Sequence, residues 1–131
     1  MTANSNPIFV IGSINTDMVA MTEVLPSPGE TVMGGEFMMT AGGKGANQAV
    51  AAARMGGDVT MIGRLGNDVF AEQSIKRLKS ENINCEFITK DTEKSSGIAL
   101  ISVDQNGENH IVVAPGANET LTKERLGSVL S

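Results

Sequence analysis

The chain has 131 residues, of which 40% are hydrophobic and 19% are charged, so it is long and apolar enough for one domain with a packed core. Its net charge of −5, without a cluster of Lys and Arg, argues against nucleic acid or an anionic membrane surface as a partner. One cysteine, one histidine and no long apolar run favour a cytoplasmic protein without a disulfide, a His-based triad, a multi-histidine metal site or a membrane segment.

An apolar run followed by glycine lies near the N-terminus. Ile8 to Ile11 contains no polar residue, which is typical of a buried parallel strand. In an extended chain the next side chains alternate between two faces, with Ser13, Asn15 and Asp17 on one and Ile14, Thr16 and Met18 on the other. Open α/β sheets bind ligands at the carboxyl ends of their strands, so Asn15 and Asp17 are candidate ligand-binding residues; a polar turn is the alternative.

Turn residues separate the next extended segments. The Pro-Ser-Pro-Gly sequence at 26–29 predicts a turn, because proline cannot continue the interior of a strand. Short strands are expected at 31–33 and 36–39, on either side of a glycine pair that forms a bulge or bend. Segments 18–25 and 30–39 would then pair antiparallel, as an arm outside the main sheet.

The stretch 40–56 combines a glycine-rich loop with a helix. Three glycines within residues 42–45 have no Cβ, so the backbone there can adopt positive φ and approach another molecule closely. The alanine-rich sequence from residue 46 onward predicts a helix, which a Gly-Gly pair ends. A helix N-terminus presents unpaired N–H groups and the positive end of the helix dipole, so we expect this loop to close over a small polar substrate.

Two nucleotide-binding motifs do not fit this loop. A Walker A motif requires Ser or Thr after its Gly-Lys pair, whereas Gly45 follows Lys44 here and Met38 stands at the position of the first glycine. A dinucleotide-binding Gly-x-Gly-x-x-Gly motif requires glycine where this chain has Gln48. Neither motif therefore explains the glycine-rich loop.

The rest of the chain alternates strands with helices. The expected elements are a strand at 58–63, a turn at 65–68 in which Asn67 or Asp68 caps a helix at 69–80, a strand at 83–88, a charged loop at 91–94, strands at 96–103 and 109–114 around a turn at 104–107, and a last helix capped by Thr122. This order predicts an α/β sheet with an appended antiparallel flap.

Six short motifs, taken together, carry a family resemblance. They are Gly12-Ser13-Ile14-Asn15-Thr16-Asp17, Leu25-Pro26-x-Pro28-Gly29-Glu30-Thr31, Gly42-Gly43-Lys44-Gly45-Ala46-Asn47-Gln48-Ala49, Ala53-Arg54-Met55-Gly56, Gly63-x-Leu65-Gly66-Asn67-Asp68 and Ala114-x-Gly116-Ala117-Asn118. The set resembles the N-terminal half of ribokinases, a family of carbohydrate kinases, over essentially the whole chain. The third motif resembles ribokinases more closely than their fructokinase or adenosine kinase relatives.

The resemblance implies a fold and an activity. The fold is a three-layer α/β/α sheet with a small antiparallel β-sheet lid, in a single domain over 1–131 with lid segments at 14–39 and 96–114. The activity is the phosphorylation of D-ribose to ribose 5-phosphate by ATP with Mg²⁺, with K⁺ as activator. The resemblance further implies a homodimer that pairs through its lid strands.

The resemblance also implies a set of sugar-binding residues. Asn15 and Asp17 would bind sugar hydroxyls from one side, Gly43, Lys44 and Asn47 would bind them from the glycine-rich loop, and Ala99 and Ile101 would cover the apolar side of the ring. Amide and carboxylate groups suit this role because they recognise hydroxyls directionally. A buried site built in this way discriminates against analogues that lack a hydroxyl.

The matched motifs do not include the family's catalytic segment. In the family, a Gly-Ala-Gly-Asp segment of the second half supplies the catalytic base and an anion hole, and the nucleotide and potassium sites lie mostly in that half. We therefore expect a truncated domain with a sugar half-site, no catalytic residue, no metal site and no kinase activity alone. A non-catalytic sugar-binding or dimerisation module, and a kinase of another sugar or nucleoside, are the alternatives.

Overall fold

The computed structural model describes residues 6–131 and divides their strands between two β-sheets. The first sheet is parallel, has the strand order β1-β4-β5, and consists of β1 (Pro7–Ile11), β4 (Asp58–Gly66) and β5 (Ile88–Asp91). The second, which we call the lid sheet, has the order β3-β2-β6-β7 and consists of β2 (Asn15–Met21), β3 (Glu36–Gly42), β6 (Gly97–Val103) and β7 (Asn109–Ala114). The helices are α1 (Lys44–Arg54), α2 (Val69–Ser80), α3 (Lys123–Leu130) and the 3-10 helix η1 (Gly116–Thr120).

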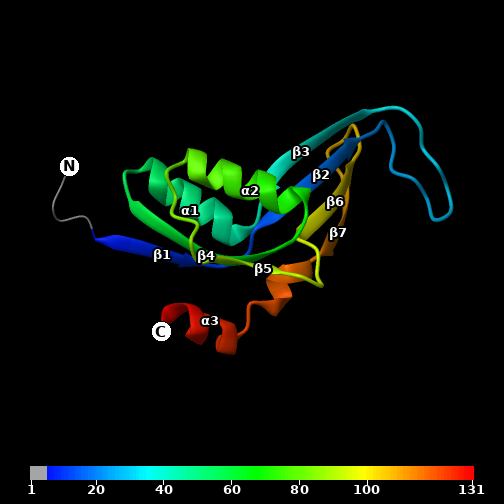
Figure 1. Ribbon diagram of the computed structural model, residues 1–131. Coiled ribbons are helices and arrows are strands. Elements are labelled where there is room, and N and C mark those ends of the chain that lie inside the picture. The colour runs from blue at the N-terminus through cyan, green and yellow to red at the C-terminus, as the bar shows by residue number, and fades with distance from the viewer. Residues whose placement is uncertain (1–5) are drawn as a thin grey trace.

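Helices cover the two sides of the parallel sheet unequally. Figure 1 shows α1 and α2 together on one side, α3 on the opposite side, and the lid sheet projecting away from all three. η1 contacts β4 and β5, whereas α3 contains no buried residue. Thr122 caps α3 as predicted, because its side-chain oxygen accepts a hydrogen bond from the N–H of Arg125. The layers are therefore those of an α/β/α arrangement with one thinly covered side.

β4 lies at the centre of the core. Every residue from Val59 to Gly66 is buried, because α1 and α2 cover one face of the strand and η1 packs against it as well. α1 approaches closely because it presents Ala46 and Ala49, each at most 1% exposed. Burial of a side chain such as Leu or Ile stabilises the fold by roughly 1.5–3 kcal/mol. The strand predicted at 58–63 is confirmed, and it continues into the segment predicted as a turn.

The two long helices agree with their predicted positions. α1 begins at Lys44, two residues earlier than predicted, and ends before Gly56, which adopts a φ of 91°. α2 spans the predicted residues, and of the two candidate caps it uses Asp68, whose Oδ1 accepts the N–H of Ala71 at 3.0 Å. The capping signal therefore located α2 correctly, and the alanine-rich sequence located α1 to within two residues of its start.

The lid sheet consists of two hairpins. β2 pairs antiparallel with β3, and β6 pairs antiparallel with β7, as predicted. The hairpins join through β2 and β6, which run parallel, so the sheet is mixed and not wholly antiparallel. The short strand predicted at 31–33 is wrong, since this segment is a loop that leads into Gly34 and Gly35, with φ of 90° and 128°.

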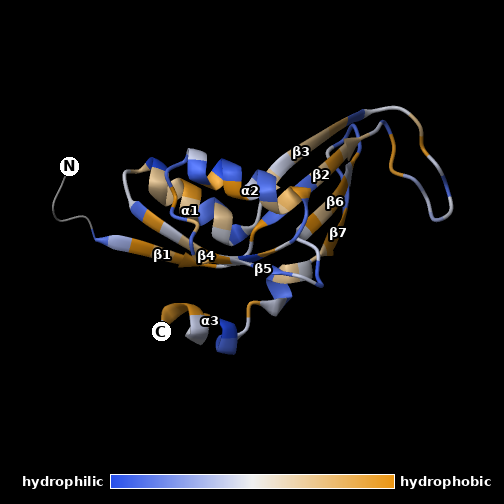
Figure 2. Cartoon of the chain, viewed as in Figure 1, coloured by the Kyte–Doolittle hydropathy of each residue, from blue (hydrophilic) through white to orange (hydrophobic). Residues whose placement is uncertain are grey.

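β1 is exposed, although the sequence predicts a buried strand. Ile8, Phe9 and Ile11 are 40%, 53% and 49% exposed, and Figure 2 shows hydrophobic residues along this strand. The prediction assumes cover on both faces, which is usual for parallel strands. β1 is instead an edge strand that pairs with β4 alone and contacts α1 on one side.

The strand predicted at 83–88 is wrong in position. Asn84 makes one isolated bridge to Thr60 of β4, and its side-chain oxygen accepts the N–H of Glu86 at 3.0 Å. This Asx turn diverts the chain, so regular pairing with β4 resumes only at Ile88. β5 therefore includes Asp91, which the sequence places in a charged loop but the structure buries.

Candidate functional site

Polar and apolar side chains share one face of the lid sheet. Asn15 and Asp17 are two residues apart in β2, so they point to the same face. Asp17 lies directly opposite Ala99 of β6, and Ile101 follows opposite Val19. Because paired residues share a face, four of the predicted sugar-binding residues lie together, two polar and two apolar. Such a surface suits a sugar, whose hydroxyls and apolar ring face need different contacts.

Glycines flank Asn15 on both neighbouring strands. Gly42 of β3 and Gly97 of β6 both pair with Asn15. A Cβ on Gly42 would collide with the carboxylate of Asp17, and a Cβ on Gly97 would collide with the side-chain amides of Asn15 and Asn118. The missing side chains therefore leave room for the polar groups of Asn15 and Asp17 to lie over the adjacent strands.

Asn15 and Asp17 form a polar row on β2. Asn118 of η1, which lies far from them in the sequence, forms a hydrogen bond with Asn15. Its Oδ1 accepts the N–H of Ile14 at 3.0 Å. Its Nδ2 donates to the carbonyl oxygen of Ile14 at 3.2 Å and to Oδ1 of Asn15 at 2.7 Å. The turn after β7 is therefore bonded to the start of β2, beside the predicted sugar-binding residues.

The glycine-rich loop holds α1 against the end of β1. Gly43 adopts a φ of 95°, and a Cβ there would collide with the backbone that leads into β2. Gly45 lies so close to Gly12 that a Cβ on Gly45 would come within 2.7 Å of the Gly12 backbone. The N–H of Ala46 donates to the carbonyl of Ser13 at 3.0 Å. Close backbone packing therefore fixes the loop next to the row that contains Asn15.

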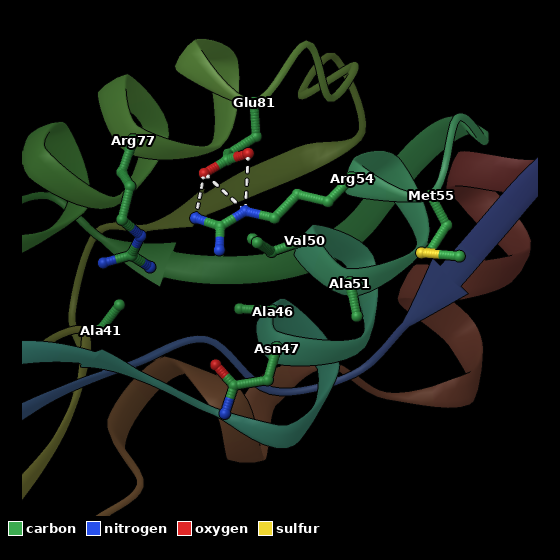
Figure 3. Close-up of a pocket in the computed structure, with 9 residues that line it drawn as sticks. All are labelled: Ala41, Ala46, Asn47, Val50, Ala51, Arg54, Met55, Arg77 and Glu81. Carbon is green, nitrogen blue, oxygen red and sulfur yellow. Dashed lines mark hydrogen bonds and ion pairs between the residues drawn. The ribbon is translucent and has the colours of Figure 1, made fainter.

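Lys44 and Asn47 lie in the first turn of α1, where both are exposed. Asn47 lines a hollow of about 540 Å³ between α1, α2 and the end of β3, shown in Figure 3. The structure thus gathers Asn15, Asp17, Ala99 and Ile101 on the lid sheet. It places Lys44 and Asn47 on the adjoining helix instead.

Two arginines border this hollow in different environments. Nη2 of Arg54 lies 2.6 Å from Oε1 of Glu81, and Nε of Arg54 lies 3.1 Å from Oε2, which joins the ends of α1 and α2 (Figure 3). The hydrogen bonds from Arg54 lower the pKa of Glu81. Nε of Arg77 is buried and has no hydrogen-bond partner within residues 6–131. Burial lowers the pKa of Arg77, and the nearby Glu81 carboxylate opposes that effect only in part.

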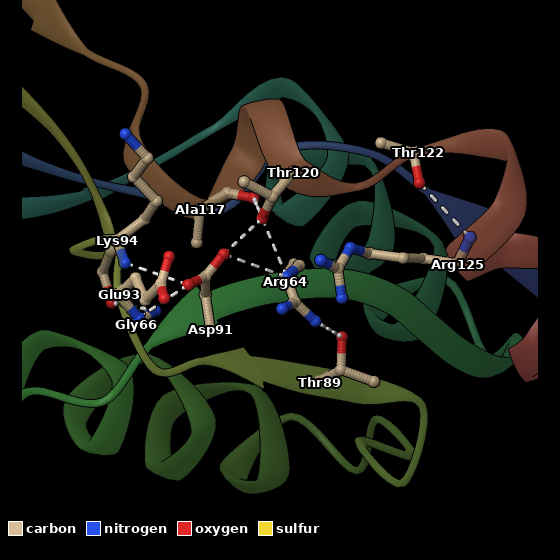
Figure 4. A network of polar contacts seen from close by, with 11 residues as sticks. Arg64, Gly66, Thr89, Asp91, Glu93, Lys94, Ala117, Thr120, Thr122 and Arg125 are labelled. Atoms are coloured by element: carbon tan, nitrogen blue, oxygen red, sulfur yellow. Dashed lines mark hydrogen bonds and ion pairs between the residues drawn. The ribbon is translucent and has the colours of Figure 1, made fainter.

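A buried polar cluster joins β4, β5 and η1. Nε of Arg64 lies 2.8 Å from Oγ1 of Thr120 and 3.4 Å from Oδ2 of Asp91 (Figure 4). Oδ1 of Asp91 accepts the N–H groups of Lys94 and Glu93 at 2.9 and 2.8 Å. These backbone hydrogen bonds and the Thr120 hydroxyl hold the pKa of Asp91 far below its usual range. The cluster therefore holds η1 against the parallel sheet.

The described residues contain no cluster of metal-binding side chains. Within residues 6–131, no three His, Cys, Asp or Glu side chains lie together in a way that could hold a metal ion. Mg²⁺ is usually bound by one or two carboxylates together with waters and substrate phosphates, and we assign no described residue to Mg²⁺ or K⁺. No helix in the described part of the chain has the length and apolar character needed to cross a membrane.

Comparison with known proteins identifies the family. Residues 5–130 match the family model described as "pfkB family carbohydrate kinase". The chain therefore belongs to the pfkB family of carbohydrate kinases, which agrees with the resemblance found in the motifs.

Its relatives include a ribokinase and a deoxyribokinase. The ribokinase of Mus musculus is 42% identical over 124 residues, which cover 95% of this chain and 38% of that protein. The deoxyribokinase of Salmonella typhi is 43% identical over 117 residues, which cover 89% of this chain and 38% of that protein. The chain thus spans about two fifths of the length of these curated relatives.

A solved structure confirms the fold class. The structure of Arabidopsis thaliana ribokinase complexed with ribose and ATP superposes with a TM-score of 0.81 at 31% identity, over 88% of this chain and 38% of that one. The predicted ribokinase-like α/β fold is therefore correct.

Three residues of the candidate site have no predicted role. Gly42 and Asn118 lie within quoted motifs, but the motifs alone do not show what they contact. Gly97 begins a strand, and glycine in a strand is itself a signal of close approach by another group. Only the folded structure shows that all three surround Asn15.

Proposed function

We propose that this chain forms the sugar-binding part of an ATP-dependent kinase whose substrate is D-ribose. The observation that carries the proposal is the row of Asn15 and Asp17 on the lid sheet, between the loop at Gly43 and the apolar Ala99 and Ile101. The 42% identity to the ribokinase of Mus musculus supports D-ribose as the substrate. The similarity to a ribokinase complexed with ribose and ATP supports both the substrate and the nucleotide.

Each part of the site would hold the sugar in a different way. Asp17 accepts hydrogen bonds from hydroxyls, because an ionised carboxylate can only accept. Lys44 and Asn47 supply donors from the first turn of α1, and Ala99 and Ile101 contact the apolar side of the ring. ATP, when bound, supplies the phosphoryl group. The chain's own residues bind and orient the sugar.

The catalytic base is expected outside the assigned residues. A general base must lie within hydrogen-bond reach of the hydroxyl that it activates. Asp17 is the carboxylate in the candidate row, and we assign it to sugar binding. Phosphoryl transfer would therefore depend on residues beyond the sugar-binding part described above, and we expect no kinase activity from this chain alone.

Titration with D-ribose tests the proposal. We would follow binding by NMR in the unaltered chain, in Asp17→Ala, and in Asp58→Ala as a control at an exposed position outside the candidate row. The unaltered chain and the control should bind ribose with millimolar affinity, and Asp17→Ala should not saturate although its circular dichroism is unchanged. Absence of binding to the unaltered chain would overturn the function, and unchanged affinity in Asp17→Ala would overturn the site.

A kinase of 2-deoxyribose is the second candidate. It is supported by the 43% identity to a deoxyribokinase, which is as high as the identity to ribokinase. The same titration with 2-deoxy-D-ribose distinguishes the two. Tighter binding of ribose favours the first candidate, because a site that bonds a hydroxyl discriminates against its absence.

We also propose that the chain forms a homodimer through the lid sheet. Leu100 and Val112 pair across β6 and β7 on the face opposite to Asp17, and both are exposed. Exposed apolar residues on a sheet favour association. Light scattering should therefore find a dimer in the unaltered chain and a monomer in Val112→Lys, whereas a monomeric unaltered chain would contradict the proposal.

A further inference from the structure

The side chain of Asn118 is held by backbone groups whose chemistry is fixed. The N–H of Ile14 can only donate, so the Asn118 atom 3.0 Å away must be the amide oxygen. The carbonyl of Ile14 can only accept, so the atom 3.2 Å from it must be the amide nitrogen. The two ends of the Asn118 amide are therefore assigned by their partners, which settles the usual ambiguity between oxygen and nitrogen.

This assignment determines the orientation of Asn15. The same Asn118 nitrogen lies 2.7 Å from the end of the Asn15 side chain, which must then be the acceptor Oδ1. The Asn15 nitrogen, with two hydrogens, is consequently the end turned away from Asn118. Within residues 6–131 it has no hydrogen-bond partner. Gly97 has no side chain at the place where Oδ1 of Asn15 meets Nδ2 of Asn118, so this contact has room to form.

We propose that Asn118 is a positioning residue that makes Asn15 a hydrogen-bond donor to the sugar. Asp17, two residues along the same face, can only accept. The row therefore presents a donor and an acceptor in a fixed order, which suits a pair of neighbouring hydroxyls. One hydroxyl accepts from Asn15 and the other donates to Asp17. This inference rests on the proposed sugar site and adds the direction of each hydrogen bond.

Replacing Asn118 by aspartate reverses the polarity of Asn15. In Asn118→Asp, one carboxylate oxygen still accepts from the N–H of Ile14, but the other can donate neither to the carbonyl of Ile14 nor to Asn15. The Asn15 amide must then turn its nitrogen toward the introduced carboxylate and its oxygen toward the sugar, beside the acceptor Asp17. We expect ribose affinity to fall at least about tenfold. Asn106→Asp adds the same charge in an exposed turn and should leave the affinity within about twofold of the unaltered chain.

A double-mutant cycle separates positioning from a general structural effect. If Asn118 acts through Asn15, the Asn118→Asp change should alter ribose affinity less than about twofold once Asn15 is already alanine. A residue needed only for folding would lower affinity equally in both backgrounds. Equal losses, or full affinity in Asn118→Asp alone, would overturn the inference.

Hydrogen exchange supplies a test that needs no ligand. The amide proton of Ile14 should be protected in the unaltered chain and in Asn118→Asp, which keeps its acceptor, and unprotected in Asn118→Ala. Equal exchange of this proton in all three proteins would overturn the assignment of the Asn118 oxygen. Failure of the unaltered chain to bind ribose would instead refute the sugar site, while the exchange result would still decide the hydrogen-bond geometry.

Discussion

Asp68 and Ser96 are joined by two hydrogen bonds that connect the start of α2 to the start of β6. The N–H of Ser96 donates to Oδ2 of Asp68 at 2.9 Å, and its hydroxyl donates to Oδ1 at 2.7 Å. Oδ1 of Asp68 also accepts the N–H of Ala71 as the helix cap. One carboxylate therefore fixes the helix layer to the strand that enters the lid sheet.

The Asp68→Asn variant tests this connection. The amide oxygen can keep the cap, but the amide nitrogen then faces the N–H of Ser96, so two donors oppose each other. We expect the free energy of unfolding to fall by about 1–3 kcal/mol, because the buried N–H of Ser96 loses its acceptor. Asp58→Asn, at an exposed position, should change it by less than about 0.5 kcal/mol. Urea unfolding measures both, and equal stabilities would contradict the prediction.

Acid should destabilise the protein through Asp68 and Asp91. Burial raises the pKa of Asp68, but hydrogen bonds from Ser96 and Ala71 outweigh it, so the pKa lies below its ordinary value; the pKa of Asp91 is lowered further. An unfolded aspartate has a pKa of about 3.9. The stabilisation is therefore complete above about pH 4 and is lost as the pH falls through the folded pKa, because the unfolded state binds more protons.

Unfolding in urea at a series of pH values checks the acid dependence. The free energy of unfolding should decline as the pH drops below about 4. Asp91→Asn should be less stable than the unaltered chain at pH 7, and the gap should narrow toward pH 2, since its amide does not titrate. A constant gap across the series would show that Asp91 does not carry this effect.

Signals confined to a few neighbouring residues predicted much of this fold. The cap at Asp68 located α2, and the Asn106-Gly107 turn located the hairpin of β6 and β7. The alternation of side chains around Asn15 also separated the two faces of β2 correctly, because Ile14 and Thr16 are buried on the face opposite to Asn15. Local chemistry decides these features, and the sequence carries that chemistry directly.

Features that depend on distant partners could not be predicted in this way. The apolar run at β1 indicates a strand, but it cannot show which faces are covered. One buried cluster contains Arg64, Asp91 and Thr120, which lie far apart in the chain. No pattern in the sequence predicts that they meet. The contact of Asn118 with Asn15 spans 103 residues, so the motif could point to Asn118 without revealing its role.

Gly97→Ala should damage both the fold and the sugar site. A Cβ at this position would collide with the amides of Asn15 and Asn118, and it would lie 3.1 Å from the carbonyl of Pro115. Overpacking of this kind typically costs about 1–3 kcal/mol. Gly127→Ala is the matched control, because a Cβ there meets open space within α3 and alanine favours helix by up to about 1 kcal/mol.

Thermal unfolding and ribose titration together assess these two glycine variants. Gly97→Ala should melt at a lower temperature and bind ribose more weakly, whereas Gly127→Ala should melt at the same or a higher temperature with unchanged affinity. If Gly97→Ala kept full affinity, the space above Gly97 would not be needed to orient Asn15.

Arg77→Met should leave the protein as stable as before or make it more stable. Nε of Arg77 is buried without a hydrogen-bond partner in the described part of the chain, and an unsatisfied buried polar group costs about 1–3 kcal/mol. Methionine keeps an apolar stem of similar reach, and Glu81 retains its hydrogen bonds to Arg54. Urea unfolding should show a gain of up to about 1 kcal/mol. Arg77→Ala, which also removes the stem, should be less stable than Arg77→Met. A loss of more than about 1 kcal/mol in Arg77→Met would mean that the guanidinium makes a favourable contact in solution.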